Sequence, residues 1–531
     1  MSWRDSKRVD GWRAAAVRAL RPGGILSKRD RLLASALAAL ADSKSDGACG
    51  AYGDMLAIDS TDFVAWYGEG WCRFTDSLVM RDENSPSGWQ FRSSFAEAAD
   101  RFERALDYAP APFAPFVMRS AADAAPVRPM LRYGWNPAHG STSDFAALPG
   151  VVRGRLAHVP LSRERVERSA RGTVPATLGE ALALSRKRSL RMSERWVRRF
   201  PESGEAHAAR GRALELQALL LPDADSQPSA DGELQQAIAL IDDDHRRVEL
   251  RVDRVRVAAK AGRIALVNAI ADSLLSGHLP GVRGHEGLLA GVAILVGRAE
   301  RAADLLESSW RQESAAGGDG VATGSAVLAS ASRFLVLSAL GVCGDTLRVL
   351  QRALETYAAG TLRGSDGAVF REQFVNRPLS LSASCESFAP SHEVASDADF
   401  LVRAQRHMAR RRPALARATL DSMERQRIVV MRSEVALDYL VQESILRLAM
   451  GDSVRAVTDL VSAVDGLVGS AAFTMEQLPQ AGAIPRALAL LNRHDPDRSR
   501  RLRRDWAGKL RQLFAKADPI VIRWNLSNEV P

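Results

Sequence analysis

The residues that could do chemistry are scattered along the 531-residue chain rather than grouped in motifs. The His-Glu pair at His285-Glu286 could open a zinc-protease helix, but Gly-Leu-Leu follows it and no second histidine does. The tripeptide His245-Arg246-Arg247 lacks the aspartate of a kinase catalytic loop. We therefore expect no catalytic residue, no cofactor and no metal-ligand set. A triad assembled in space would leave no such motif, so an enzyme on an unrecognised helical fold stays a second alternative.

The run Asp242-Asp243-Asp244 offers three neighbouring carboxylates, which could suggest a metal site. Basic residues follow it closely, at Arg246, Arg247 and Arg251. Acidic side chains are stabilised near the amino end of a helix, where the helix dipole is positive. We interpret the run as negative charge at a helix end.

The four cysteines lie far apart and form no C-x-x-C pair, at Cys49, Cys72, Cys343 and Cys385. This spacing predicts neither a zinc site nor a disulfide framework, and it favours a reducing compartment. We expect Cys49 and Cys72 to be small core residues of packed helices. The chain also lacks an apolar stretch long enough to span a bilayer, and we expect it to be cytoplasmic.

Composition points to a folded, all-α protein. Hydrophobic residues make up 46% of the chain and aromatic residues 6%. The apolar share is mostly Ala, Leu and Val, a mixture that favours closely packed helices, and no sustained strand alternation appears. The net charge of +9 comes mainly from arginine. It could serve an anionic partner or simply keep the surface soluble.

One segment carries a clear helical-repeat pattern, from Phe63 to Pro110. Trp66 and Gly70 are four residues apart, which places a large and a small residue on one helix face. The next helix has Ala98, Phe102 and Ala105 on one face, at steps of four and three, and Pro110 marks its end. The preceding segment fits the same frame through Leu32–Ala41 and the positions Ala48, Tyr52 and Met55.

This pattern resembles the tetratricopeptide repeat, with an insertion near Asp76–Ser93 relative to the 34-residue period. At a wider scale the chain looks like the repeat-bearing region that follows the kinase domain in certain bacterial serine/threonine protein kinases, without the kinase itself. The resemblance implies a helical-hairpin solenoid with a right-handed superhelix, and a role in protein contact or sensing.

Farther along, a glycine followed five residues later by a small or apolar residue recurs, as in Gly262/Val267, Gly297/Ala302, Gly344/Val349 and Gly451/Ala456. Each is a candidate helix–turn–helix unit, with core positions continuing at Ala271, Leu274, Leu306, Ala353, Leu460 and Ala463. Proline- and glycine-rich stretches divide the chain into N-terminal repeats at 1–118, a connection at 119–160, a middle helical block at 161–359, a second connection at 360–399, and C-terminal repeats at 400–531.

Two segments carry most of the excess positive charge. Ser162–Phe200 includes Arg186-Lys187-Arg188 and Arg191, and Arg498–Lys516 forms a basic amphipathic helix with Leu502, Trp506, Leu510 and Leu513 on one side. We favour a terminal cap for the second segment, because a solenoid needs one polar outer face. The alternative is contact with an anionic partner.

Together these patterns predict a non-catalytic scaffold, sensor or adaptor that binds a protein or peptide partner in a helical groove. The alternative is a ligand-sensing regulator that contacts nucleic acid through the Arg-rich helices. The residues that bind the partner are not identifiable from the sequence.

Overall fold

A computed structural model describes most of the chain. The chain forms two compact units, and the boundary between them lies between Ala218 and Leu219. Each unit is considered by itself. The described residues are 9–21, 26–76, 79–81, 89–91, 95–124, 128–130, 145–152, 155–160, 178–221, 228–315, 325–340, 345–360, 404, 407–408, 410–426, 437–469, 483–513, 515 and 517–521.

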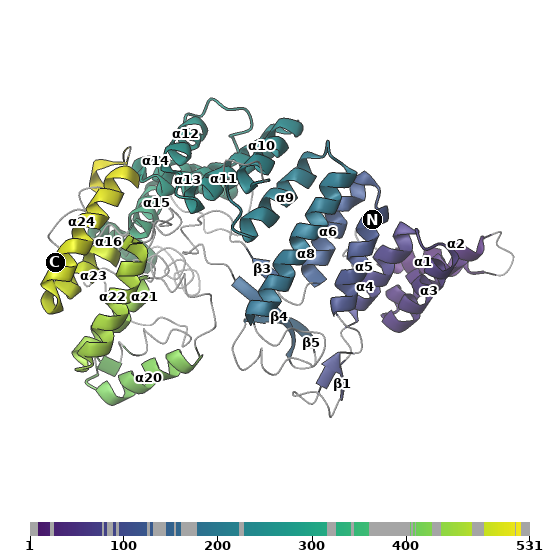
Figure 1. The fold of residues 1–531 in the computed structure, drawn as a ribbon, viewed down its shortest axis with the longest axis horizontal. Coiled ribbons are helices and arrows are strands. Elements are labelled where there is room, and N and C mark those ends of the chain that lie inside the picture. The colour runs from purple at the N-terminus through teal and green to yellow at the C-terminus, as the bar shows by residue number, and fades with distance from the viewer. Residues whose placement is uncertain are drawn as a thin grey trace. The chain divides into compact units, whose positions relative to one another are not determined.

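The first unit is a series of helices in which each packs against the next (Figure 1). The helix α8 returns to contact both α5 and α6, and α9 packs on α8. The helices are α1 (Val9–Ala19), α2 (Lys28–Ala41), α3 (Ser45–Ile58), α4 (Phe63–Thr75), α5 (Phe95–Tyr108), α6 (Ala114–Ala124) with the short 3-10 turn η2 (Ala111–Phe113) before it, α8 (Leu178–Arg199) and α9 (Gly204–Leu216).

The second unit repeats the same arrangement of sequential helical pairs. Its helices are α10 (Ala230–Leu240), α11 (Asp244–Lys260), α12 (Ile264–Leu275), α13 (Glu286–Leu295), α14 (Ala299–Ala315), α15 (Ser325–Ala339), α16 (Asp345–Gly360), α20 (Pro413–Gln426), α21 (Leu437–Ala449), α22 (Ser453–Gly469), α23 (Ala483–His494) and α24 (Pro496–Leu513). The chain is thus all-α and built of consecutive hairpins. Among the described helices, none is both long and apolar enough to cross a bilayer. The handedness of the superhelix and the five-part division stay predictions.

The described strands occur in the connections of the first unit and are a feature that the sequence pattern did not predict. Inside the predicted insertion, β1 (Val79–Arg81) pairs antiparallel with β2 (Trp89–Phe91), with Met80 opposite Gln90. In the proline-rich connection, β3 (Arg128–Met130), β4 (Phe145–Val152) and β5 (Arg155–Pro160) form an antiparallel sheet in that order. β1, β2 and β3 have three residues each, and the longer β4 (FAALPGVV) and β5 (RLAHVP) show no sustained alternation of apolar and polar residues.

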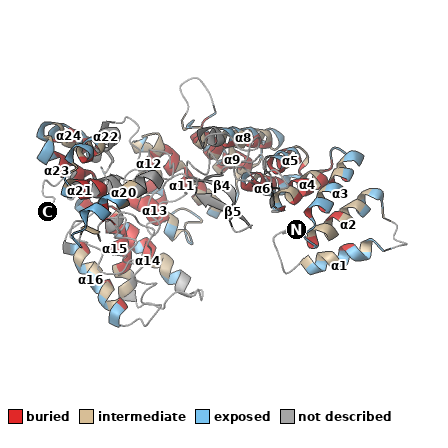
Figure 2. Cartoon of the chain, turned by 90° about the horizontal axis from the view of Figure 1, so that it is seen from below, coloured by how far each residue is buried: buried red, intermediate tan, exposed pale blue. Residues whose placement is uncertain are grey.

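The predicted repeat positions lie in the core of the first unit. The side chains at the helix B positions of both repeats are fully buried: Ala48, Tyr52, Met55, Ala98, Phe102 and Ala105. Buried residues along the helices are marked in Figure 2. Small alanines alternate with large aromatic rings, which is the combination that lets neighbouring helices pack without voids. The structure confirms the frame of the two repeats.

Three of the four recurring glycines occupy the turns that the pattern predicts. Gly262, Gly297 and Gly451 follow α11, α13 and α21 with φ between 68° and 80°, a left-handed conformation that favours glycine after a helix. The paired residues Val267, Ala302 and Ala456 are buried. Ala271, Leu274, Leu306 and Leu460 are also buried as predicted, whereas Gly344 and the side chain of Ala463 lie outside the described residues.

The prediction for α16 is wrong in its helix face. Val349 is 64% exposed and Ala353 is exposed as well. The core positions of α16 are Leu347 and Leu354, seven residues apart and therefore on one side of the helix. The same five-residue step reaches a buried residue in the other three cases, so the step alone does not fix which face of the following helix is buried.

Candidate functional site

The helix α4 packs unusually close to its two neighbours because of two glycines. A Cβ on Gly68 would lie 2.3 Å from the Tyr52 ring of α3, and one on Gly70 would lie 2.8 Å from the Phe102 ring of α5. The predicted role of Gly70 as a point of close approach is confirmed, and Gly68 adds a second. Burial raises the pKa of the Tyr52 phenol, which sits between α3 and α4.

A disulfide joins α3 to α4, and this corrects the expectation that the cysteines are unpaired. Cys49 and Cys72 are bonded, with their Cα atoms 5.6 Å apart. Cys72 is fully buried, so the expectation of a core position is correct for that residue. The two residues are brought together by helix packing over a separation of 23 residues, which no short cysteine motif signals. Cys343 and Cys385 lie outside the described residues.

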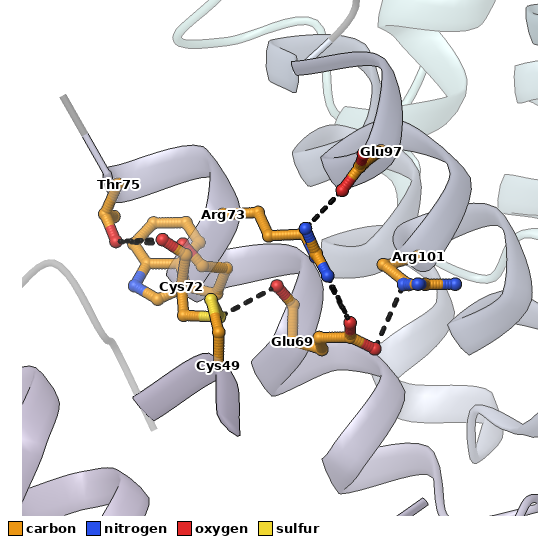
Figure 3. Close-up of a disulfide and its surroundings, with 8 residues drawn as sticks. Cys49, Glu69, Cys72, Arg73, Thr75, Glu97 and Arg101 are labelled. Atoms are coloured by element: carbon orange, nitrogen blue, oxygen red, sulfur yellow. Dashed lines mark hydrogen bonds and ion pairs between the residues drawn. A yellow bond between two sulfur atoms is a disulfide. The ribbon is translucent and has the colours of Figure 1, made fainter. Parts of the chain in front are cut away.

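Beside the disulfide, a buried carboxylate anchors an ion-pair network between α4 and α5. Glu69, which is only 5% exposed, pairs with Arg73 at 2.9 Å and with Arg101 at 3.0 Å. Arg73 continues to Glu97, and the Arg101 guanidinium lies over the half-buried Trp66 ring, 5.4 Å from its centroid. Figure 3 shows Glu69 held between the two arginines. The network offers no free carboxylate for acid–base chemistry, so we interpret it as structural.

A row of aromatic side chains runs along another face of α4. Phe63, Tyr67, Trp71 and Phe74 follow one another at helical spacing, and all four are half-buried. Ring contacts order the row, with centroids 5.9 Å apart for Phe63 and Tyr67 and 5.8 Å apart for Trp71 and Phe74. The rings therefore rest on the core while each leaves part of its surface open to solvent.

The aromatic row continues onto the segment that carries η2 and α6. The Phe113 ring lies 5.6 Å from the Phe63 ring, and the Tyr67 hydroxyl lies 3.0 Å from the Ser120 hydroxyl. Phe113 is 44% exposed and Phe116 is 57% exposed. We call these six residues the aromatic face: Phe63, Tyr67, Trp71, Phe74, Phe113 and Phe116. Their spacing on α4 was visible in the sequence, but their partial exposure depends on how α6 packs.

The described part of the first basic segment is largely neutralised inside the first unit. Arg191 donates to both carboxylate oxygens of Glu103 at 2.6 Å, and Arg195 lies 3.3 Å from the same group. Arg188 pairs with Asp100 and lies 3.8 Å from Glu103. Burial alone would raise the pKa of the Glu103 carboxyl, but the Arg191 hydrogen bond and the three positive charges hold that pKa below its ordinary value.

The acidic run is a helix end, as predicted. Asp243 caps α11 by accepting from the His245 amide at 2.9 Å, and Asp244 pairs with Arg247 at 3.0 Å. The His245 and His285 rings approach to 5.3 Å without forming a metal set. In the described part of the chain, no group of three or more His, Cys, Asp or Glu side chains is arranged to hold a metal ion.

Comparisons with known proteins add little to this geometry. No family model matches the sequence, and no curated protein matches it. Among solved structures, a human IFIT1 dimer with PPP-AAAA aligns at 12% identity over 98% of this chain and 96% of that one, with a TM-score of 0.34. A complex of Naa15 and Naa10 bound to HypK-THB aligns at 12% identity over 95% of this chain and 66% of that one, with a TM-score of 0.29. Similarity this low supports no conclusion about function, and the helical-hairpin organisation is seen directly in the structure.

Proposed function

We propose that the chain is a non-catalytic binding protein whose first unit docks an apolar segment of a partner protein on the aromatic face. The observation that carries the proposal is the exposure of that face. Phe113 and Phe116 present about half of their surface to solvent, and Phe113 lies beside the Phe63 ring of α4. Large aromatic side chains are enriched at the centres of protein interfaces.

The face suits an apolar partner segment because its rings offer a broad, rigid surface and few polar groups. Phenylalanine, tyrosine and tryptophan lose little side-chain entropy on binding, and each ring that a partner covers removes a large apolar area from water. The Tyr67 and Ser120 hydroxyls already contact each other, so they place no unsatisfied polar group at the edge of the face. The resemblance to repeats that follow bacterial kinase domains makes a serine/threonine kinase the first partner to test.

Photocrosslinking tests the proposal in the full chain. Benzoyl-phenylalanine replaces Phe116 in one sample and Val454 of α22, which is 80% exposed, in the control sample. We expect a protein that crosslinks at position 116 and not at position 454. That protein is then purified for direct measurement of its dissociation constant.

The binding measurement compares two double variants that remove equal numbers of exposed apolar side chains. Phe113→Ser with Phe116→Ser should weaken binding about 10-fold or more, because truncated interface aromatics commonly cost that much. The matched control, Val349→Ser with Val454→Ser, lies in the second unit and should bind like the wild type. Equal affinity of both double variants for the crosslinked partner would refute the proposal.

A further inference from the structure

The two Arg-rich segments of the sequence have different surroundings in the structure. On α8, Arg188, Arg191 and Arg195 pair with acidic side chains of α5. On α24, Arg501, Arg504 and Arg511 are exposed, and within the described residues no acidic side chain pairs with them. The arginines of α24 therefore contribute to the uncompensated positive charge at the surface, whereas the charge of the three α8 arginines is compensated by acidic side chains.

One side of α24 is fixed to the core of the second unit. Leu502 and Trp506 are buried in the large apolar cluster of that unit, and the Ser499 hydroxyl donates to the Leu488 carbonyl at 2.7 Å. This confirms the expected packing for Leu502 and Trp506, while the side chains of Leu510 and Leu513 lie outside the described residues. The helix is thus held in one rotation, with a fixed outer face.

The outer face carries a row of guanidinium groups. Arg500, Arg504 and Arg511 recur at steps of four and seven residues, which brings them onto one side of the helix, and Arg501 flanks the row. Arg500 is paired with the exposed Asp497, and the exposed Asp505 lies at the edge of the face. The row therefore keeps a net positive charge over a helix length of about 16 Å from Arg500 to Arg511.

A glycine opens the middle of this row. Gly508 lies between Arg504 and Arg511, and a Cβ built there would meet nothing within 4 Å. The missing side chain lowers the surface at that point, so a ligand backbone could approach the helix between the arginines. Glycine serves the same purpose where proteins approach phosphate groups closely.

The chemistry of the face favours a phosphate backbone over other polyanions. A nucleic-acid duplex carries about one charge per 1.7 Å of its axis, so a row of about 16 Å can meet several phosphates at once. Among its described side chains, the face has no aromatic ring to stack on bases and no large apolar side chain to seat an acidic peptide. Membrane insertion is disfavoured, because Leu502 and Trp506, which would enter the lipid, are already buried in the core.

We infer that the outer face of α24 is a sequence-independent site for the phosphate backbone of duplex nucleic acid, held by Arg501, Arg504 and Arg511. This site is in the second unit and is independent of the aromatic face. Arginine is suited to the task because its planar guanidinium donates two parallel hydrogen bonds to a phosphate.

Fluorescence anisotropy with a labelled 20-base-pair DNA duplex tests the inference, and an RNA duplex of the same sequence distinguishes the two sources of phosphate. Neutralising three phosphates gives a slope of log affinity against log salt of about −2.7, or about a 40-fold loss between 50 and 200 mM salt. The triple variant Arg501→Gln, Arg504→Gln and Arg511→Gln should reduce the steepness of that slope by about 2.7, to near zero, and weaken binding at low salt.

A second triple variant supplies the matched control. Arg263→Gln, Arg301→Gln and Arg352→Gln remove the same charge from three exposed positions spread over the second unit. This control should bind the duplex like the wild type. If both triple variants weaken binding equally, or if a polyglutamate peptide or phosphatidylserine vesicles bind α24 more tightly than either duplex, the inference is overturned.

Discussion

The contact between Gly68 and Tyr52 offers a sharp test of how α3 and α4 pack. Replacement of Gly68 by alanine would put a Cβ 2.3 Å from two carbon atoms of the Tyr52 ring. Carbon atoms in good contact are about 3.5–4.0 Å apart, so the ring would have to move. Tyr52 is fully buried, and α3 is further tied to α4 by the Cys49–Cys72 bond. The ring therefore has little room to yield.

A glycine on α3 allows the cost of this clash to be isolated. Gly53 lies inside α3, and a Cβ there would meet nothing within 4 Å. Both Gly53→Ala and Gly68→Ala gain about 1 kcal/mol of helix propensity. Only Gly68→Ala adds overpacking, which costs about 1–3 kcal/mol. The difference in unfolding free energy between the two variants should therefore be about 1–3 kcal/mol, with Gly68→Ala the less stable.

Hydrogen exchange in the full chain, followed by mass spectrometry of peptides from residues 45–75, measures this difference locally. Global unfolding curves would mix the two units, whereas peptides from α3 and α4 report only their own opening. Relative to the wild type, we expect these peptides to exchange faster in Gly68→Ala and slower in Gly53→Ala. If Gly68→Ala protects these peptides as well as Gly53→Ala does, the close approach of α4 to Tyr52 is wrong.

Three further perturbations test the first unit. Ala98→Asp buries an unpaired charge at a fully buried position and should unfold α4–α6, seen as lost helical circular dichroism, whereas Trp66→Asp at a half-buried site should cost less. A peptide map without reductant should show Cys49 linked to Cys72. Reduction should lower the local stability of α3 and α4 by about 3 kcal/mol, measured by hydrogen exchange in the peptides from residues 45–75. Folding lowers the pKa of Glu103. Its contribution to the stability of the fold is therefore present above the unfolded pKa of about 4.3 and is lost as pH falls through the folded pKa. Glu103→Gln should flatten this acid dependence in thermal melts.

The sequence predicts the core of the first unit well because helical periodicity states it directly. Ala48, Tyr52 and Met55 recur at steps of four and three, and such steps place side chains on one helix face whatever the partner helix is. The prediction for Val349 failed, and its starting point was Gly344, an expected turn residue, rather than the periodicity of the helix itself. Periodicity indicates which residues share a face, but only packing decides which face is buried.

The candidate site was less predictable, because each of its features arises between helices. The Cys49–Cys72 bond requires α3 and α4 to lie side by side at one register, and no spacing within either helix encodes that register. The aromatic face has a similar origin. The spacing of its rings on α4 is that of a buried stripe. In the structure η2 contacts the row at Phe63 and α6 contacts it at Tyr67, and the four rings stay half-buried.

The two basic segments show why charge composition alone could not identify an anion site. Glu103 lies opposite Arg188, Arg191 and Arg195 because α8 packs on α5 at that register, so these three arginines serve the internal packing of the first unit. On α24 the buried Trp506 fixes the rotation that turns Arg504 and Arg511 to solvent. An arginine that is already paired with a carboxylate offers a partner less net charge and fewer free donors than an unpaired one. The location of neighbouring acidic residues therefore decides which arginines are available, and among the described residues Arg501, Arg504 and Arg511 of α24 have no acidic partner.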